Sequence, residues 1–320
     1  MRALVTGGGG FIGHHLVRRL LDDGAEVAVI DDFSTGQRER LEPFLDRITF
    51  VEGSILDRDA LDAAIRSCEV VFHEAAIPSV ARSMVEPQLT NRVNVDGSIS
   101  VMLAAARNGV RRVVFAGSSS VYGIPERLPC RETQRPGPQS PYGASKIAAE
   151  HYILTLGELH GVDTVILRYF NVFGPGQDPN SEYAAVVPKF VTAVLAGQRP
   201  TINGDGTVSR DFTYVDNVVE ANMLAARAAA TRLVCNVACG SRQTLLDLLR
   251  AIGDASGCDA GAVFGPPRAG DIEHSQADIA LARKELGYRV VVPFEEGIAR
   301  TVAWYQQAQE RSVDALAQSA

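Results

Sequence analysis

The sequence is poor in cysteine, in lysine and in long apolar runs. Five cysteines occur in 320 residues, and no Cys-x-x-Cys pair is present, which is typical of reduced cytoplasmic thiols rather than of a disulfide framework. Every apolar run falls short of the ~18 residues that a membrane-spanning helix needs. Positive charge is in deficit, because 31 Lys and Arg stand against 38 Asp and Glu, a net charge of −7. An acidic chain repels nucleic acids and anionic lipids, so we expect neither as a partner.

Two further scarcities narrow the candidate sites. The six histidines do not fall into ligand spacing with cysteines or carboxylates, so we expect no metal site. Lysine occurs only at positions 146, 189 and 284, so a motif that contains lysine is more informative here than elsewhere. The glycine-rich start leaves no room for a signal peptide. We therefore expect a cytoplasmic protein.

Short β-rich runs alternate with helical patterns through the first half of the chain. Strand–helix alternation predicts right-handed crossovers and an α/β fold with a doubly wound parallel sheet. We expect strands at 2–6, 26–31, 48–51, 69–73, 112–116 and 164–168, and helices at 11–23, 89–108 and 142–160. The pattern loosens after Asn171. The sequence thus predicts a sheet domain over 1–170, a smaller domain over 171–310 with the chain crossing between the two, and a polar tail over 311–320.

A glycine loop joins the first expected strand to the first expected helix. Gly7, Gly10 and Gly13 have the spacing G-x-x-G-x-x-G, which permits a tight turn and close approach of a pyrophosphate to the backbone. A glycine motif alone is weak evidence. Asp31 strengthens it, because a carboxylate at the end of the second strand can bind the adenosine ribose and repels a 2′-phosphate. With Asp32 beside it, the loop predicts NAD rather than NADP.

A tyrosine, a lysine and a serine form the candidate catalytic group. Tyr142 and Lys146 are four residues apart on an expected helix, so their side chains share one face. The lysine cation, together with a positive nicotinamide ring, would stabilise the Tyr142 phenolate as a base near neutral pH. Ser118 ends a central strand, where a hydroxyl can reach a substrate. A strand-end turn explains such a serine equally well.

These motifs together resemble the extended short-chain dehydrogenase/reductase family, and within it the nucleotide-sugar epimerases. The resemblance covers residues 1 to about 308 and includes the runs RYFNVFG at 168–174, YAAVVPKF at 183–190, INGDG at 202–206, SRDF at 209–212 and RAGD at 268–271. It is greatest to bacterial UDP-N-acetylglucosamine 4-epimerases. It implies a Rossmann-type sheet, a C-terminal α/β substrate domain, tightly bound NAD and a homodimer.

The resemblance also implies roles for individual residues. The implied cofactor residues, besides Tyr142 and Lys146, are Gly7, Gly10, Phe11, Ile12, Gly13, Asp31, Asp32, Ser34, Thr35, Gly36, Ser54, Ile55, Ala75, Ala76, Ile77, Asn94, Phe170 and Val172. The implied residues for a UDP-sugar, besides Tyr142, are Ser79, Ser118, Ser119, Ser120, Asn171, Ala185, Val186, Phe190, Thr201, Asn203, Arg210, Arg268, Asp271 and Ser275. Arginine suits a diphosphate by its chemistry alone, although an arginine at the surface is common in this chain.

Ser275 is the implied gate of the sugar pocket. A tyrosine at this position in relatives excludes an N-acetyl group, and serine leaves room for one. The resemblance therefore implies a UDP-hexose 4-epimerase that interconverts UDP-GlcNAc and UDP-GalNAc, and also UDP-glucose and UDP-galactose. Ser54, Glu74 and Thr201 depart from the usual pattern, which puts some contacts in doubt.

Three other functions stay open at this point. A 4,6-dehydratase of the same family needs an additional acid and base, but the positions after Ser118 carry Ser119 and Ser120 rather than carboxylates. A UDP-glucuronate 4-epimerase, or another nucleotide-sugar epimerase, is compatible with the motifs. A non-catalytic NAD-binding sensor belongs to a different class, and it has no need of Tyr142, Lys146 and Ser118 together.

Overall fold

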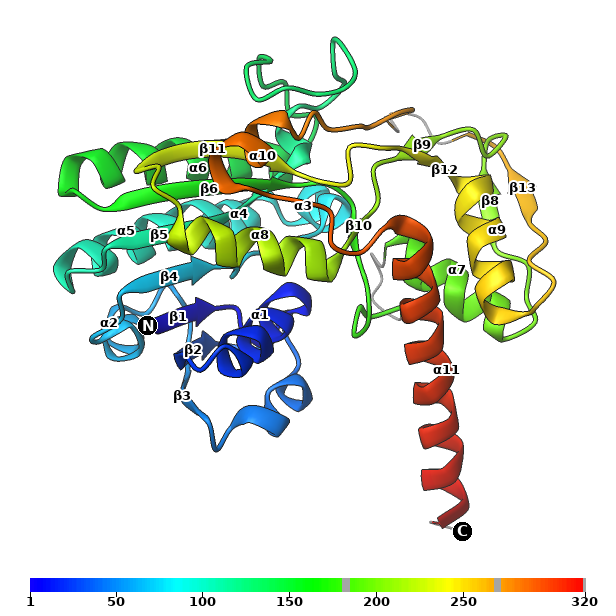
Figure 1. The fold of residues 1–320 in the computed structure, drawn as a ribbon, viewed down its shortest axis with the longest axis horizontal. Coiled ribbons are helices and arrows are strands. Elements are labelled where there is room, and N and C mark those ends of the chain that lie inside the picture. The colour runs from blue at the N-terminus through cyan, green and yellow to red at the C-terminus, as the bar shows by residue number, and fades with distance from the viewer. Residues whose placement is uncertain (180–184, 268–271, 319–320) are drawn as a thin grey trace.

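The computed structural model describes residues 1–179, 185–267 and 272–318, and a seven-stranded sheet lies at its centre (Figure 1). The strand order is β11-β6-β5-β4-β1-β2-β3, and every neighbouring pair is parallel. The strands are β1 (Arg2–Thr6), β2 (Glu26–Asp31), β3 (Ile48–Glu52), β4 (Val70–His73), β5 (Arg112–Ser118), β6 (Asp163–Tyr169) and β11 (Arg232–Val237). The doubly wound α/β fold expected from the alternation is confirmed.

Helices cover both faces of this sheet, which is why its strands are apolar on both sides. On one face, Val5, Phe72 and Val114 share a core with α1 (Phe11–Asp22) and α8 (Val215–Arg227). On the other face, a second core includes residues of α2 (Arg58–Ile65), α5 (Gly97–Arg107) and α6 (Pro141–His160). We call this assembly the sheet lobe.

The helix expected over 89–108 is interrupted. The structure has α4 (Pro87–Asn91), a π-helical turn (Arg92–Asp96) and then α5. The wider turn accompanies an inward-facing Asn94, whose side-chain Oδ1 accepts a hydrogen bond from the backbone of Ile77 at 2.8 Å. Such turns are frequent at functional sites, and the hydrophobic period alone does not reveal them.

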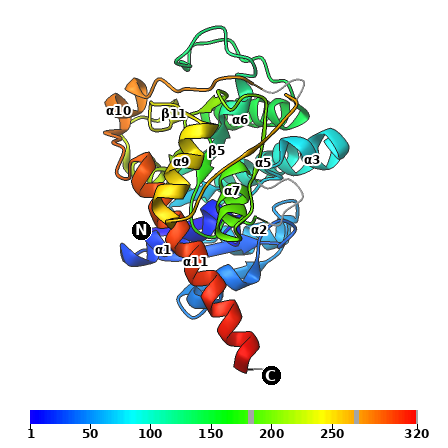
Figure 2. The same cartoon turned by 90° about the vertical axis from the view of Figure 1, so that its right-hand side faces the viewer.

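A second lobe lies beyond the carboxyl ends of the strands, at one side of the sheet in Figure 1. Its helices α7 (Val186–Leu195), α9 (Leu245–Ser256) and α11 (Phe294–Gln318) pack together. Short strand pairs complete it: β8 (Thr201–Asn203) with β13 (Val263–Gly265), and β9 (Ser209–Arg210) with β12 (Gln243–Thr244). Figure 2 shows α11 running away from both lobes towards the C-terminus. The residues expected as a polar tail from 311 continue this helix as far as Gln318.

The chain passes between the lobes more than once. The segments α8 and β11 follow residue 171 in sequence but belong to the sheet lobe, where β11 pairs with β6. The pair β7 (Val172–Phe173) with β10 (Thr213–Tyr214) lies at the crossing. Two short helices complete the chain: α3 (Val80–Val85) follows β4, and α10 (Ala280–Leu286) precedes α11. The bounds 1–170 and 171–310 stay predictions, with α8 and β11 as the segments that cross back to the sheet lobe.

Candidate active site

The glycine loop packs closely against neighbouring backbone and leaves no room for a Cβ at Gly7 or Gly13. Gly7 has a φ of +70°, and a Cβ there would lie 2.7 Å from the Cα of Ala75. A Cβ on Gly13 would lie 2.1 Å from the carbonyl oxygen of Gly7. The loop leads directly into α1, whose first N–H groups have no partner within the helix. A side chain therefore does not fit at either position of this glycine cradle, and the N-terminus of α1 offers N–H groups for the phosphates of a dinucleotide.

Asp31 lies beside this loop at the end of β2. Its Oδ2 accepts a hydrogen bond from the backbone N of Gly9 at 2.8 Å, and its Oδ1 accepts one from Phe33 at 2.8 Å. Burial raises the pKa of the Asp31 carboxyl, and the two N–H donors oppose this shift. Asp32 accepts from the backbone of Ser34 at 3.0 Å. The loop and the predicted ribose carboxylate are therefore adjacent, as an NAD site requires.

Most of the remaining predicted cofactor residues follow β2, β3 and β4 at the same edge of the sheet. Asn94 ties this edge to α6, because its Nδ2 donates to the carbonyl of Ile77 at 3.2 Å and to the Oγ of Ser145 at 3.0 Å. The residues of this group are Ser34, Thr35, Gly36, Ser54, Ile55, Ala75, Ala76 and Ile77. Phe170 differs, since it is buried against Tyr122 at 1% exposure. Their roles stay predictions.

The candidate catalytic trio meets at the carboxyl ends of β5 and β6. The side chains of Ser118 and Tyr142 are hydrogen-bonded to each other. Lys146 donates from Nζ to the carbonyl oxygen of Ala116 at 2.9 Å, and its Nζ lies 6.0 Å from the centre of the Tyr142 ring. The N-cap of α6 is Ser140, whose side chain accepts from the backbone of Gly143. This cap begins the helix one residue before the tyrosine and so places Tyr142 at its first turn.

The ionisation of the trio differs from the expectation for Tyr142. Burial raises the pKa of Tyr142, the charge of Glu74 raises it further, and the hydrogen bond with Ser118 opposes both. Burial also lowers the pKa of Lys146 to about 8, against the attraction of Glu74. The protein by itself thus does not produce a low phenol pKa. Desolvation of the buried phenolate is the largest of these effects.

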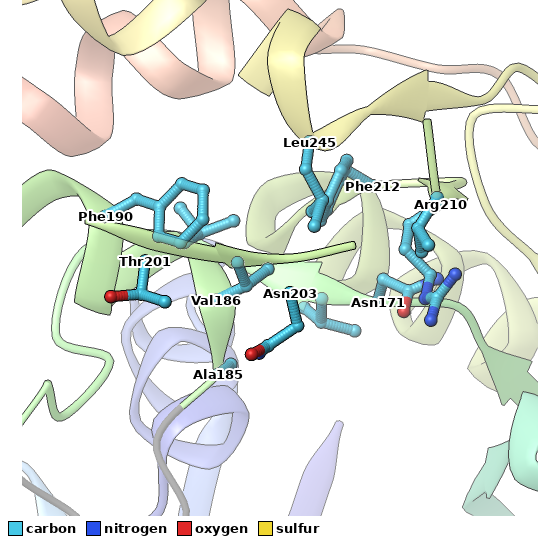
Figure 3. Close-up of a pocket in the computed structure, with 12 residues that line it drawn as sticks. Asn171, Ala185, Val186, Phe190, Thr201, Asn203, Arg210, Phe212 and Leu245 are labelled. Carbon is cyan, nitrogen blue, oxygen red and sulfur yellow. The ribbon is translucent and has the colours of Figure 1, made fainter. Parts of the chain in front are cut away.

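A cavity of about 260 Å³ lies in the second lobe and is bordered by Asn171 and Val172, which follow β6 (Figure 3). In Figure 3, Asn171 and Arg210 lie together at one end, and Phe190 and Thr201 lie at the other. Seven residues predicted for the UDP-sugar line this cavity: Asn171, Ala185, Val186, Phe190, Thr201, Asn203 and Arg210. It also includes Val172, which we expect to contact the cofactor, and four residues that we do not predict: Val187, Val208, Phe212 and Leu245.

The other predicted substrate residues differ in placement. Ser275 lies next to the cavity, because its Oγ accepts a hydrogen bond from Nδ2 of Asn171 at 3.1 Å. Ser79 caps α3 and accepts from the backbone of Arg82 at 3.0 Å. Ser119 and Ser120 form a 3₁₀ turn directly after Ser118. Arg268 and Asp271 lie outside the described residues.

The comparisons with known proteins agree with this geometry. The family model described as "NAD dependent epimerase/dehydratase family" matches residues 3–238. A UDP-glucose 4-epimerase of Mycolicibacterium smegmatis is 42% identical over 311 residues, which is 96% of this chain and 99% of that protein.

This chain belongs to the NAD-dependent epimerase/dehydratase family.

Solved structures of family members superpose closely on it. A UDP-glucose 4-epimerase of Thermotoga maritima, solved with UDP-glucose, has a TM-score of 0.92 at 36% identity and covers 97% of this chain and 100% of its own. A UDP-N-acetylglucosamine 4-epimerase of Methanobrevibacter ruminantium has a TM-score of 0.91 at 40% identity, and the match covers 96% of this chain and 98% of that protein. The resemblance read from the motifs is confirmed, as is NAD as the family's cofactor.

The structure adds a contact between the lobes that the sequence analysis misses. Three successive carbonyls of the segment after β7 are each held by a different element. His15 Nε2 donates to Pro175 at 2.8 Å, and Arg40 donates to Gly176 at 2.6 Å and also to Gly9 of the glycine loop at 3.0 Å. Tyr305 of α11 donates to Gln177. No spacing in the sequence signals these contacts, because the partners are far apart in the chain.

Two absences concern only the residues that the structure describes. Within 1–179, 185–267 and 272–318, no three or more His, Cys, Asp or Glu side chains are grouped to hold a metal ion. No helix in that part of the chain is both long and apolar enough to cross a membrane.

Proposed function

We propose that this protein is a UDP-hexose 4-epimerase that retains NAD and interconverts UDP-GlcNAc with UDP-GalNAc and UDP-glucose with UDP-galactose. The observation that carries the proposal is the position of the trio. Ser118, Tyr142 and Lys146 gather at the carboxyl edge of the sheet, where the glycine cradle follows β1 and Asn171 of the cavity wall follows β6. A reacting sugar carbon there can reach both a base and a dinucleotide.

The two ends of the cavity suit the two ends of a UDP group. The guanidinium of Arg210 supplies donors for a diphosphate. Phe190 and Val186 supply an apolar wall for a base, and Asn203 and Thr201 supply polar groups beside it. Binding of the constant UDP part would leave the sugar free to turn above the trio.

Tyr142 is the proposed acid and base for the sugar 4-hydroxyl. Its phenol oxygen would take the hydroxyl proton, directly or through Ser118, and would return it at the end of the cycle. When bound, NAD supplies a hydride acceptor for carbon 4 and a positive charge near the phenol. Lys146 would hold the nicotinamide ribose and add its own charge. Because burial raises the phenol pKa, Tyr142 needs these positive charges to act near neutral pH.

The test is turnover without added cofactor. Proton NMR would follow the configuration at carbon 4 of UDP-GlcNAc and, separately, of UDP-glucose. Conversion of both supports the epimerase, the retained NAD and an open gate at Ser275. Conversion of UDP-glucose alone contradicts the gate. Turnover of UDP-glucuronate alone would make that acid the substrate, and NAD binding without any turnover would indicate a sensor.

We also propose a homodimer through the outer faces of α5 and α6. Tyr152 and Leu159 are seven residues apart on α6, so they share one face, and they are 48% and 72% exposed. Leu103 of α5, which packs beside α6, is 36% exposed. Analytical ultracentrifugation of the native chain and of Leu159→Glu tests this interface. A native monomer, or an unchanged dimer in the variant, contradicts it.

A further inference from the structure

Glu74 is a titratable group inside the candidate active site to which the proposed reaction assigns no task. It follows β4 at the carboxyl edge of the sheet. Its backbone N donates to the carbonyl of Thr6 at 3.3 Å, and a Cβ on Gly7 would lie 3.1 Å from the carbonyl carbon of Glu74. On the other side, His73 pairs with Phe115 in the register of β4 and β5. Glu74 is therefore level with Ala116.

This level is also where Lys146 is anchored. Its Nζ donates to the carbonyl oxygen of Ala116 at 2.9 Å. Glu74 thus lies between the glycine cradle and the catalytic trio. A dinucleotide whose phosphates occupy the cradle and whose reacting ring meets Tyr142 must pass this position.

One oxygen of the Glu74 carboxyl is held in place from two elements behind it. Asn222 of α8 donates from Nδ2 to the hydroxyl oxygen of Tyr169 at 2.8 Å. The single hydroxyl hydrogen of Tyr169 is then available for Oε1 of Glu74, also at 2.8 Å. Both Asn222 and Tyr169 are buried, so the two hydrogen bonds fix the orientation of the Glu74 carboxyl from the core side.

The other carboxyl oxygen is free to meet a ligand. Oε2 makes no hydrogen bond to any residue that the structure describes, and it is not among the polar atoms sealed from solvent there. The side chain is only half-buried although protein surrounds it. A carboxyl oxygen that has no partner among the described residues and keeps access to solvent at the carboxyl edge of the sheet is available to a ligand.

Among the residues that the structure describes, three titratable groups face Glu74 from neighbouring elements. They are Lys146 and Tyr142 of α6 and Tyr169 of β6. Burial raises the pKa of Glu74 to about 7, against the hydrogen bond from Tyr169 and the charge of Lys146. Its carboxyl therefore changes charge across the neutral range, whereas most carboxylates stay ionised there.

We propose that Glu74 faces the nicotinamide end of the bound cofactor and sets the preference of this protein for the oxidised over the reduced form. The inference rests on the proposed function for the presence of a nicotinamide ring at the trio. The oxidised ring carries a positive charge and the reduced ring carries none. An ionised Glu74 attracts the first and is indifferent to the second, and a protonated Glu74 favours neither.

This preference matters for an epimerase, because the hydride must be returned to the sugar in every cycle. A site that favours the oxidised ring releases the hydride readily. It also leaves little cofactor stranded in the reduced form if a keto sugar escapes.

The experiment compares dissociation constants for NAD⁺ and NADH, by titration calorimetry, in a Tyr142→Phe background. That background removes the phenolate, so its charge cannot contribute. Glu74→Gln keeps a carbonyl oxygen that can accept from Tyr169 and removes only the charge. At pH 8.5 the additional substitution should reduce the preference for NAD⁺ by about tenfold, or about 1.4 kcal/mol. At pH 5.5 the two proteins should agree.

Glu132→Gln is the matched control. Glu132 is a partly buried carboxylate with a raised pKa, and it accepts a backbone hydrogen bond from Asn236 at 2.8 Å. Its removal should leave the ratio of the two constants unchanged. An equal effect of both substitutions would mean that net charge matters and position does not, which overturns the proposal.

An unchanged ratio in a folded Glu74→Gln protein overturns the proposal directly. If that variant does not fold, Tyr169→Phe provides the second test in the same background. Loss of the hydroxyl donor should raise the pH midpoint at which the NAD⁺ preference develops, and an unmoved midpoint counts against Glu74. Neither readout requires turnover of a UDP-sugar, so failure of the proposed activity would be seen separately, by NMR.

Discussion

The substitution Gly13→Ala brings two opposing effects, a gain in helix propensity and a steric clash with the glycine loop. Gly13 lies in the first turn of α1, where alanine is favoured over glycine by up to ~1 kcal/mol. The new Cβ would lie 2.1 Å from the carbonyl oxygen of Gly7, and a real Cβ contact needs about 3.0 Å. The loop must therefore move by roughly 3.0 − 2.1 = 0.9 Å.

The neighbouring backbone blocks this movement of the loop. Gly7 is already at a positive φ and packs against Ala75. Overpacking of this kind costs about 1–3 kcal/mol, so we expect the clash to exceed the gain in helix propensity. A shift of the cradle also disturbs hydrogen bonds to a charged phosphate, each worth about 1.5–3 kcal/mol. NAD affinity should fall by about 10- to 100-fold, and the melting temperature should fall as well.

The assay measures NAD content after gel filtration, NAD affinity on reconstitution, and thermal unfolding by circular dichroism. Gly137→Ala is the control, because the nearest atom to its Cβ, the carbonyl oxygen of Tyr122, lies 3.6 Å away. It should retain NAD like the native protein. If Gly13→Ala also retains NAD and melts at a higher temperature, helix propensity outweighs the contact, and the argument for a sealed cradle is refuted.

The remaining predictions concern the trio, the gate, a buried ion pair and acid stability. Tyr142→Phe should lower kcat by at least about 100-fold, and a rate near that of the native protein in the NMR assay would remove its role as base. Ser275→Tyr should abolish turnover of UDP-GlcNAc and preserve that of UDP-glucose, and parallel loss of both would indicate a structural defect instead. Glu150→Gln should lower the free energy of unfolding in urea by about 3–5 kcal/mol. The buried guanidinium of Arg168 lies 2.5 Å from Oε1 of Glu150 and would lose its counter-charge. A loss below about 1 kcal/mol would contradict this. Burial lowers the pKa of His73 to about 3, so between pH 6.5 and 3 the unfolded chain binds a proton that the folded chain does not. The free energy of unfolding, measured by urea titration, should therefore decline on acidification by up to ~1.4 kcal/mol per pH unit from this group. In His73→Asn the decline should be shallower.

The parts of this protein that follow from the sequence alone are those set by neighbours along the chain. The glycine spacing, the entry into α1 and the carboxylate that ends β2 depend on turn geometry and on one strand–helix unit. Tyr142 and Lys146 share a face because the helical period places residues four apart on one side. The alternation of strands and helices likewise determines the doubly wound sheet, since right-handed crossovers leave few alternatives.

The tertiary structure alone decided which distant residues meet. The cavity takes its walls from separate segments between Asn171 and Leu245, and Ser275 reaches Asn171 across 104 positions. Glu74 changes from an unusual residue after a strand into an oriented acid only when β6 and α8 supply its partners. The raised pKa of Tyr142 belongs here too. Burial, unlike spacing, depends on every element packed around a group, and no local pattern in the sequence encodes it.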